Sequence, residues 1–122
     1  MERSPALAAL SALAHETRLD IVRFLVPHRA EGAPAGEIAR AVKVSASGLS
    51  FHLKLLEQAG LVAARREGRQ VIYHLDRHRM GTLFHYLLHD CCGGDPEIRD
   101  CCFARRAHEG HRTSALTLPP RK

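Results

Sequence analysis

The sequence holds four cysteines, which stand as two adjacent pairs and carry the most distinctive chemistry in the chain. Cys91-Cys92 and Cys101-Cys102 are separated by residues 93–100, which begin with two glycines. Neighbouring cysteines seldom form a disulfide with each other because the peptide between them would be strained, whereas the glycines let the second pair fold back on the first. Soft thiolates select soft metals and metalloids. Trivalent arsenic or antimony takes three sulfur ligands in a pyramid, so these cysteines would offer three ligands and one spare.

The composition limits the class of protein to which such cysteines belong. The chain has 122 residues, of which 45% are apolar, and 18 Lys and Arg against 13 Asp and Glu give a net charge of +5. This size suits one domain with a modest core, and the charge suits a polyanionic partner without requiring one. Residues 1–15 lack the pattern of a signal peptide, and no run approaches the roughly 20 apolar residues of a membrane span. We therefore predict a cytoplasmic protein without a membrane partner, in which the cysteines are metal ligands or redox groups rather than a disulfide framework.

The stretch from Ser45 to Leu75 predicts a helix that runs directly into a β-hairpin. Ser45 is placed to cap the helix and Gly60 to end it. Two short strands follow, 61–65 and 70–75, and the turn at 66–69 contains Gly68. A helix with a small polar face followed by an arginine-tipped hairpin is typical of a winged helix-turn-helix, whose ligand is duplex DNA. The packed face of the helix would hold Leu49, Leu53 and Leu56, and the opposite face Ser47, Ser50, Phe51 and Lys54.

The rest of the chain predicts a mainly helical α+β fold in the order α-α-α-α-β-β-α. Helices are expected at 4–15, 16–26 and 35–42, with a loop over 27–34, and the turn 43–46 completes a helix-turn-helix. The first helix carries a stripe of three leucines, and a last helix over 76–88 carries a stripe too apolar to stay exposed. We therefore expect a homodimer through the first and last helices. Residues 1–92 would form the DNA-binding and dimerisation domain, and residues 93–122 a cysteine-containing, partly disordered tail.

Several segments along this order share a set of motifs. They are Ala14-His-Glu-Thr-Arg-Leu-Asp-Ile-Val-Arg-Phe-Leu25, Gly36-Glu-Ile-Ala39, Ser47-Gly-Leu-Ser-Phe-His-Leu53, Ala59-Gly-Leu-Val62 and Arg66-Glu-Gly-Arg69 with Tyr73. Over about residues 5 to 90 this set closely resembles the ArsR/SmtB family of winged-helix, metal-sensing repressors. The resemblance implies a homodimer that occupies an operator and leaves it when an inducer binds. Members often carry Gln where this chain has Ala46, so the operator sequence stays open.

The candidate DNA contacts come from the hairpin and from the helix that begins at Ser45, called here the reading helix. Serine hydroxyls can bond base edges or phosphates, the Phe51 ring can meet a thymine methyl, and Lys54 suits a phosphate. His52 lies at the edge of the packed face, so it either orients the helix or bonds a phosphate. The hairpin arginines are either DNA contacts or surface charge, and we expect contact from at least one. The full set is Ser45, Ser47, Ser50, Phe51, His52, Lys54, Arg65, Arg66 and Arg69.

The resemblance also implies which residues bind the inducer. Some arsenite sensors of the family place a Cys-Cys pair and a later cysteine after this last helix, which implies Cys91, Cys92 and Cys101 as ligands, with Cys102 as an alternative third ligand. The family's other arsenical site, on the helix before the reading helix, is missing because residues 35–46 contain no cysteine. We therefore predict a repressor that leaves its operator when As(III) or Sb(III) binds these thiolates.

Other interpretations of the same residues stay open. Asp76, His78 and His89 fall at the spacing of the zinc site that other members build across the paired last helices, and Cys92 stands where they use Glu or His. A Zn(II)-responsive repressor is therefore an alternative, unless Asp76 only caps the helix and the histidines are solvated. A thiol redox sensor and a repressor without a ligand would use the same fold. We do not expect an enzyme, because the sequence has no phosphate-cradling loop and no Cys-x-x-Cys at a helix start.

Overall fold

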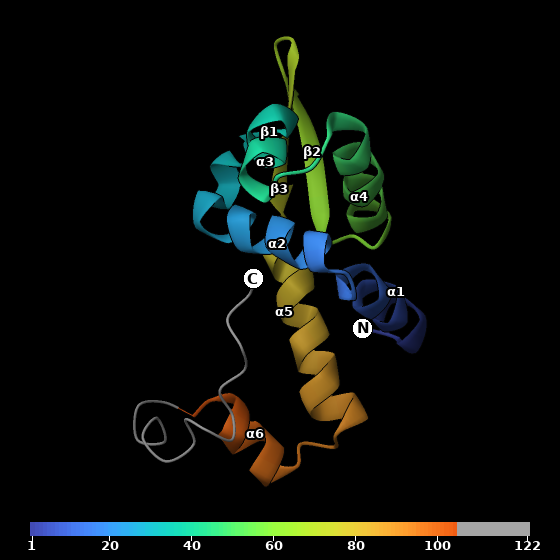
Figure 1. Ribbon diagram of the computed structural model, residues 1–122. Coiled ribbons are helices and arrows are strands. Elements are labelled where there is room, and N and C mark those ends of the chain that lie inside the picture. Colours follow the sequence, from blue (N-terminus) through green and yellow to red (C-terminus); the bar gives the residue numbers. More distant parts are fainter. Residues whose placement is uncertain (105–122) are drawn as a thin grey trace. The chain divides into compact units, whose positions relative to one another are not determined.

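The order of helices and strands follows the predicted winged helix-turn-helix, with three additions. The computed structural model describes residues 1–104, and the chain divides into two units, Met1–Tyr86 and a second that begins at Leu87. The added elements are a short helix and a short strand before the third α-helix, and a helix in the second unit. In chain order (Figure 1) the elements are α1 (Arg3–Leu13), α2 (Glu16–Leu25), the 3₁₀ helix η1 (Val26–Glu31), β1 (Ala33–Pro34), α3 (Ala35–Val42), α4 (Ala46–Gln58), β2 (Val62–Glu67), β3 (Gln70–Leu75), α5 (Arg77–His85), the π-helix η2 (Tyr86–Cys91) and α6 (Pro96–Cys102).

The hairpin forms an antiparallel sheet with the order β1-β3-β2. Glu67 pairs with Gln70, so the loop consists of Gly68 and Arg69, and Gly68 has φ +63°, the left-handed conformation that such a tight turn requires. Arg66 and Glu67 were predicted in the turn but belong to β2, because this two-residue turn lets strand pairing continue to its edge. The hairpin projects past α3 and α4 (Figure 1).

The segment predicted as a loop over 27–34 is structured, which corrects that prediction. Pro27 ends α2 but occupies the first turn of η1, where its missing N–H is not needed. Ala33 and Pro34 then pair with Tyr73 and Ile72 of β3, at the edge of the sheet, where a proline is tolerated. Gly32 has φ +67°, and a side chain there would collide with the carbonyl of Tyr73. The segment is therefore fitted closely to the base of the hairpin.

The core of the first unit is formed mainly by apolar side chains of α2, α3 and α4, with further residues from the hairpin and α5. Helix α3 has the predicted bounds, and Lys43 ends it in the left-handed conformation before α4 begins. The three leucines predicted on the packed face of α4 are buried. The largest fully buried side chains are Ile21, Leu25, Ile38, Leu49, Leu53, Leu56, Leu61 and Leu83. Apolar burial thus fixes α4 against the rest of the unit, which positions its opposite face.

Helix α1 packs through a different stripe from the one that its leucines suggest. Ala6, Ala9 and Ala12 are buried against α2 and α4, whereas Leu7 is 58% exposed and Leu10 is 38% exposed. Alanines let helix backbones approach closely, so the small residues face inward and the leucines point away. The leucine stripe therefore does not contribute to the core of its own unit and forms an exposed apolar surface.

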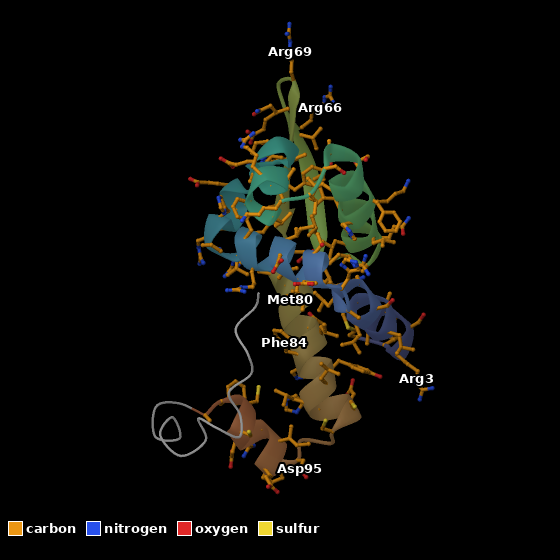
Figure 2. All side chains as sticks on the ribbon, viewed as in Figure 1. Arg3, Arg66, Arg69, Met80, Phe84 and Asp95 are labelled. Atoms are coloured by element: carbon orange, nitrogen blue, oxygen red, sulfur yellow. The ribbon has the colours of Figure 1, made fainter. Side chains whose placement is uncertain are left out.

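Helix α5 is shorter than predicted, because regular α-helix ends at His85 and the π-helix η2 follows. Leu83 is buried, but Phe84, labelled in Figure 2, is 54% exposed. In the second unit, Gly93 and Gly94 both have positive φ, and Asp95 caps α6 by accepting hydrogen bonds from the N–H groups that follow it. Helix α6 was not predicted. Most of the tail predicted to be partly disordered lies outside the described residues, and the predicted domain boundary after Cys92 stays a prediction.

Candidate nucleic-acid interface

Helix α4 presents the predicted face of small polar side chains around one exposed aromatic ring. Ser47, Ser50 and Lys54 are exposed, and the Phe51 ring is 59% exposed although phenylalanine normally packs into a core. The buried leucines on the other side of α4 hold this face outward. The face therefore has the size and chemistry to enter a major groove, where serines can bond base edges and a ring can meet a thymine methyl.

Ser45 caps α4 as predicted. Its Oγ atom accepts a hydrogen bond from the backbone N–H of Gly48 at 3.0 Å and lies 3.4 Å from Oγ of Ser47. A cap of this kind satisfies one of the N–H groups that a helix start leaves without partners. Ser45 therefore fixes the start of α4, and its predicted role as a DNA contact stays a prediction.

His52 is held by a buried arginine that the sequence reasoning did not single out. Arg18 is only 9% exposed; its Nη1 donates to Nδ1 of His52 at 3.1 Å, and its Nε donates to the carbonyl oxygen of Ala12. The His15 ring lies 4.5 Å from the His52 ring, measured between centroids. Partial burial, followed by the charges of His15 and Arg18, lowers the pKa of His52 below its ordinary value. These contacts join α1, α2 and α4, which supports the orienting role for His52.

The sequence did contain a signal for Arg18. This residue shares its helix face with Ile21, Val22 and Leu25, at spacings of three, four and seven, and all three are buried. A charged residue on the same face as three buried apolar residues predicts a buried cation that needs hydrogen-bond acceptors. Ala12 O and His52 Nδ1 supply them.

The three hairpin arginines occupy two different environments. Arg66 and Arg69 are exposed, and Figure 2 shows both projecting at the far end of the hairpin. Arg65 instead bonds within the chain, to the carboxylate of Glu67 and to the carbonyl oxygens of Ala30 and Glu31. The tip of the hairpin therefore carries two exposed cations, and Arg65, in the middle of β2, is already bonded within the chain.

A second arginine outside the predicted set contacts the end of α4. A Cβ atom added to Gly60, which has φ +79°, would lie 2.7 Å from Nε of Arg79 and 2.8 Å from its Cζ and Nη2 atoms. This Nε is buried and has no hydrogen-bond partner within the described residues. Nearby, the backbone N–H of Asp76 donates to the carbonyl of Leu61 at 2.8 Å. The start of α5 is thus joined to the residues that follow α4.

The four cysteines all lie in the second unit. Cys91 and Cys92 are at the end of η2 and just after it, and Cys101 and Cys102 are the last residues of α6. Cys92 is half-buried and the other three are exposed. Partial burial, a hydrogen bond with Cys91 and the negative charge of Asp95 raise the pKa of the Cys92 thiol. Within residues 1–104, no three His, Cys, Asp or Glu side chains stand close enough together to hold a metal ion.

The carboxylate of the alternative zinc set is engaged in the fold. Oδ1 of Asp76 accepts a hydrogen bond from the backbone N–H of Arg79 at 2.9 Å and so caps α5. This is the capping role that the sequence left open for Asp76. His78 and His89 are both exposed, and their role in metal binding stays a prediction. None of the helices in residues 1–104 is long and apolar enough to cross a membrane.

Comparison with known proteins agrees with this geometry. A family model described as a helix-turn-helix domain matches residues 13–65. The chain is 35% identical over 89 residues to the transcriptional activator HlyU of Vibrio cholerae, covering 71% of this chain and 80% of that protein. It is 34% identical over 92 residues to a probable mercury resistance operon repressor of Streptomyces lividans, covering 75% of this chain and 70% of that protein.

These two relatives, each more than 30% identical and covered over more than two thirds of its length, show the family, and two further similarities agree with it. The chain is 38% identical over 74 residues to the transcriptional repressor SmtB of Mycobacterium tuberculosis, covering 61% of this chain and 53% of that protein. The fold matches an ArsR-like transcriptional regulator from Rhodococcus sp. RHA1 with a TM-score of 0.66 and 20% identity, over 94% of this chain and 96% of that chain. These relatives are transcriptional regulators rather than enzymes. The chain belongs to the ArsR/SmtB family of winged helix-turn-helix, DNA-binding transcriptional regulators.

Proposed function

We propose that this regulator is a homodimeric repressor, and that trivalent arsenic or antimony releases it from operator DNA by binding cysteine thiolates. The observation that carries the proposal is the placement of four free thiols within a short stretch of one unit, with three of them exposed and Cys92 half-buried. They are the thiols of Cys91, Cys92, Cys101 and Cys102. Soft thiolates at this density select soft metals and metalloids. The similarity to a probable mercury resistance operon repressor also supports a soft metal or metalloid as the signal.

Three-coordinate sulfur binding would require the two cysteine pairs of the second unit to come together, because no three of these side chains lie close enough within residues 1–104. Gly93 and Gly94, both with positive φ, turn the chain directly after the first cysteine pair. Helix α6 then carries the second pair in its last turn. Each cysteine that binds arsenous acid would replace one hydroxyl group, and the thiol proton would leave with that hydroxyl as water. Cys92, whose raised pKa keeps it protonated, can take part without prior loss of its proton.

The first unit supplies the DNA-binding side of the proposal. The two α4 helices of a dimer would enter successive major grooves about 34 Å apart. Leu7 and Leu10 on α1 and Phe84 on α5 are exposed apolar side chains, which supports a dimer through these two helices. Because such a dimer must meet its operator DNA, we also propose that it is cytoplasmic.

The test measures operator binding with and without arsenite by fluorescence anisotropy under reducing conditions. A coupling of about 1–3 kcal/mol between the two ligands would weaken DNA binding about 5- to 150-fold. Cys91→Ser with Cys92→Ser leaves two thiols, so it should retain DNA binding and lose the response. Cys102→Ser alone leaves three thiols and should respond like the unmodified chain. The proposal fails if the double variant still releases DNA on addition of arsenite.

The same assay separates the alternatives. Release of DNA by Zn(II) but not by arsenite would favour the zinc site that includes His78 and His89. In the structure, Oδ1 of Asp76, the carboxylate of that site, already accepts the hydrogen bond that caps α5. Release by an oxidant, reversed by a thiol reductant, would indicate a redox sensor. Retention of DNA under all three treatments would indicate a repressor without these ligands.

A further inference from the structure

The Arg65 side chain, in the middle of β2, joins the hairpin to the end of η1. Its Nε donates to Oε2 of Glu67 at 2.7 Å, its Nη1 donates to the carbonyl oxygen of Ala30 at 2.7 Å, and its Nη2 donates to the carbonyl oxygen of Glu31 at 2.8 Å. All three guanidinium nitrogens therefore have acceptors within the protein. Two of these acceptors are the final carbonyls of η1, which its short helix leaves without intrahelical partners.

The segment that receives these bonds has an unusual backbone. Arg29 has φ +54° and ψ −142° inside η1, a conformation that L-residues rarely adopt and that surrounding contacts must maintain. Ala33, just beyond the two bonded carbonyls, pairs with Tyr73 of β3. The Arg65 guanidinium thus joins β2 directly to the end of η1, while strand pairing joins the residues after η1 to β3 and β3 to β2. The hairpin tip extends beyond these linked elements.

We propose that Arg65 is a positioning residue, which fixes the angle of the hairpin so that Arg66 and Arg69 meet the DNA backbone, and which does not bind DNA itself. The inference rests on the proposed contact of the hairpin tip with DNA and is independent of any metalloid. Arg65 is poorly suited to a phosphate because each of its three guanidinium nitrogens already donates one hydrogen bond and the Glu67 carboxylate lies 2.7 Å from its Nε. Arg66 and Arg69 are exposed at the tip (Figure 2) and have neither restriction.

Replacing Arg65 by lysine separates positioning from phosphate binding. Lysine keeps the positive charge, so it would preserve most of a phosphate contact, but it cannot reproduce a fork that bonds two carbonyls and a carboxylate together. We expect Arg65→Lys to weaken operator binding about fivefold to tenfold, with a matching fall in the salt dependence, because each phosphate that the tip no longer neutralises removes about 0.9 from the log–log slope. The matched control is Arg66→Lys, which should stay within about twofold of the unmodified chain.

A double-mutant cycle tests whether Arg65 acts through the tip. In a background carrying Arg66→Ala and Arg69→Ala, the tip contacts are already gone, so Arg65→Lys should change operator affinity by less than about twofold. An effect of Arg65→Lys that persists in this background would overturn the proposal, and so would an Arg65→Lys variant that binds like the unmodified chain. The Arg66→Ala and Arg69→Ala background, measured alone, tests the tip contact itself, so the two failures are distinguishable. Urea unfolding of each variant identifies general destabilisation, which would act equally in both backgrounds.

Glu67→Gln supplies a second measurement that leaves the bonds of Arg65 to the η1 carbonyls in place. Removing a negative charge beside DNA would strengthen binding if charge alone mattered. If Glu67 instead helps to hold the Arg65 side chain against η1, Glu67→Gln should weaken operator binding when Arg66 and Arg69 are present and have little effect when both are replaced. Tighter operator binding by Glu67→Gln would contradict the proposal.

Discussion

Replacing Gly60 by alanine should destabilise the first unit through two separable effects. Gly60 ends α4 with φ +79°, and an alanine in the left-handed region costs about 1–2 kcal/mol. The new Cβ would also lie 2.7 Å from Nε of Arg79, so the guanidinium would have to move, and overpacking of this kind costs about 1–3 kcal/mol. The expected loss, about 2–5 kcal/mol in the free energy of unfolding, is a large part of the roughly 5–15 kcal/mol typical of a domain.

The structural origin of this loss can be measured with Arg79→Ala. In that background the collision is absent, so Gly60→Ala should cost only the backbone contribution of about 1–2 kcal/mol. Urea unfolding followed by circular dichroism, at one fixed protein concentration, gives the four free energies of the cycle. Gly36→Ala is the control, because Gly36 lies in α3 without a positive φ and a Cβ there would meet only Arg40 at 3.8 Å; it should stabilise by about 0.5–1 kcal/mol. Equal costs of Gly60→Ala with and without Arg79 would refute the contact between Arg79 and the end of α4.

Three further predictions concern acid sensitivity, proton release and DNA contacts. Because the pKa of His52 is lower in the folded than in the unfolded chain, its contribution to stability is complete above its ordinary value of 6.5 and is lost as the pH falls through the folded value. The free energy of unfolding should therefore fall less between about pH 7 and pH 5 for His52→Gln than for the unmodified chain. Binding of arsenous acid should release almost no protons into a weakly buffered solution, because each thiol proton leaves as water. Zn(II) binding that uses Cys92 must instead displace the proton of the Cys92 thiol. Proton release on addition of arsenite, detected with a pH-sensitive dye, would refute the exchange of hydroxyl for thiol. Phe51→Ala should weaken specific DNA binding with an unchanged salt slope, whereas Lys54→Gln should lower the slope by about 1 for each phosphate that Lys54 neutralises.

The elements that position the interface could be predicted because their signals are local. The bounds of α3, the cap at Ser45 and the end of α4 at Gly60 each depend on residues within one or two turns of the chain. The hairpin depends on a tight turn at Gly68 and on alternation in the flanking strands. These signals act at short range, so the reading helix and hairpin were assigned with nearly their observed bounds.

Elements that depend on a distant partner could not be predicted in the same way. Strand β1 has two residues and exists because Ala33 meets Tyr73 of β3, which no local pattern announces. In α1, alanines and leucines both recur every three residues, so periodicity gives two neighbouring stripes and does not say which one faces the core. Close packing against α2 and α4 selected the alanines. The leucine stripe that remains exposed is the surface that the proposed dimer would cover.

The arginines show why the roles of single side chains are the hardest to predict from sequence. Arg65 and Arg66 are neighbours in one strand, so they point to opposite faces of the sheet. One of them meets the carbonyls at the end of η1 and the other meets solvent. Strand alternation separates the two faces but does not say what each face meets, and it is the carbonyls of Ala30 and Glu31 that give Arg65 its acceptors. A basic hairpin in this family therefore predicts a DNA-binding surface, but which cations reach the DNA and which hold the hairpin in place depends on the acceptors that the fold brings near each one.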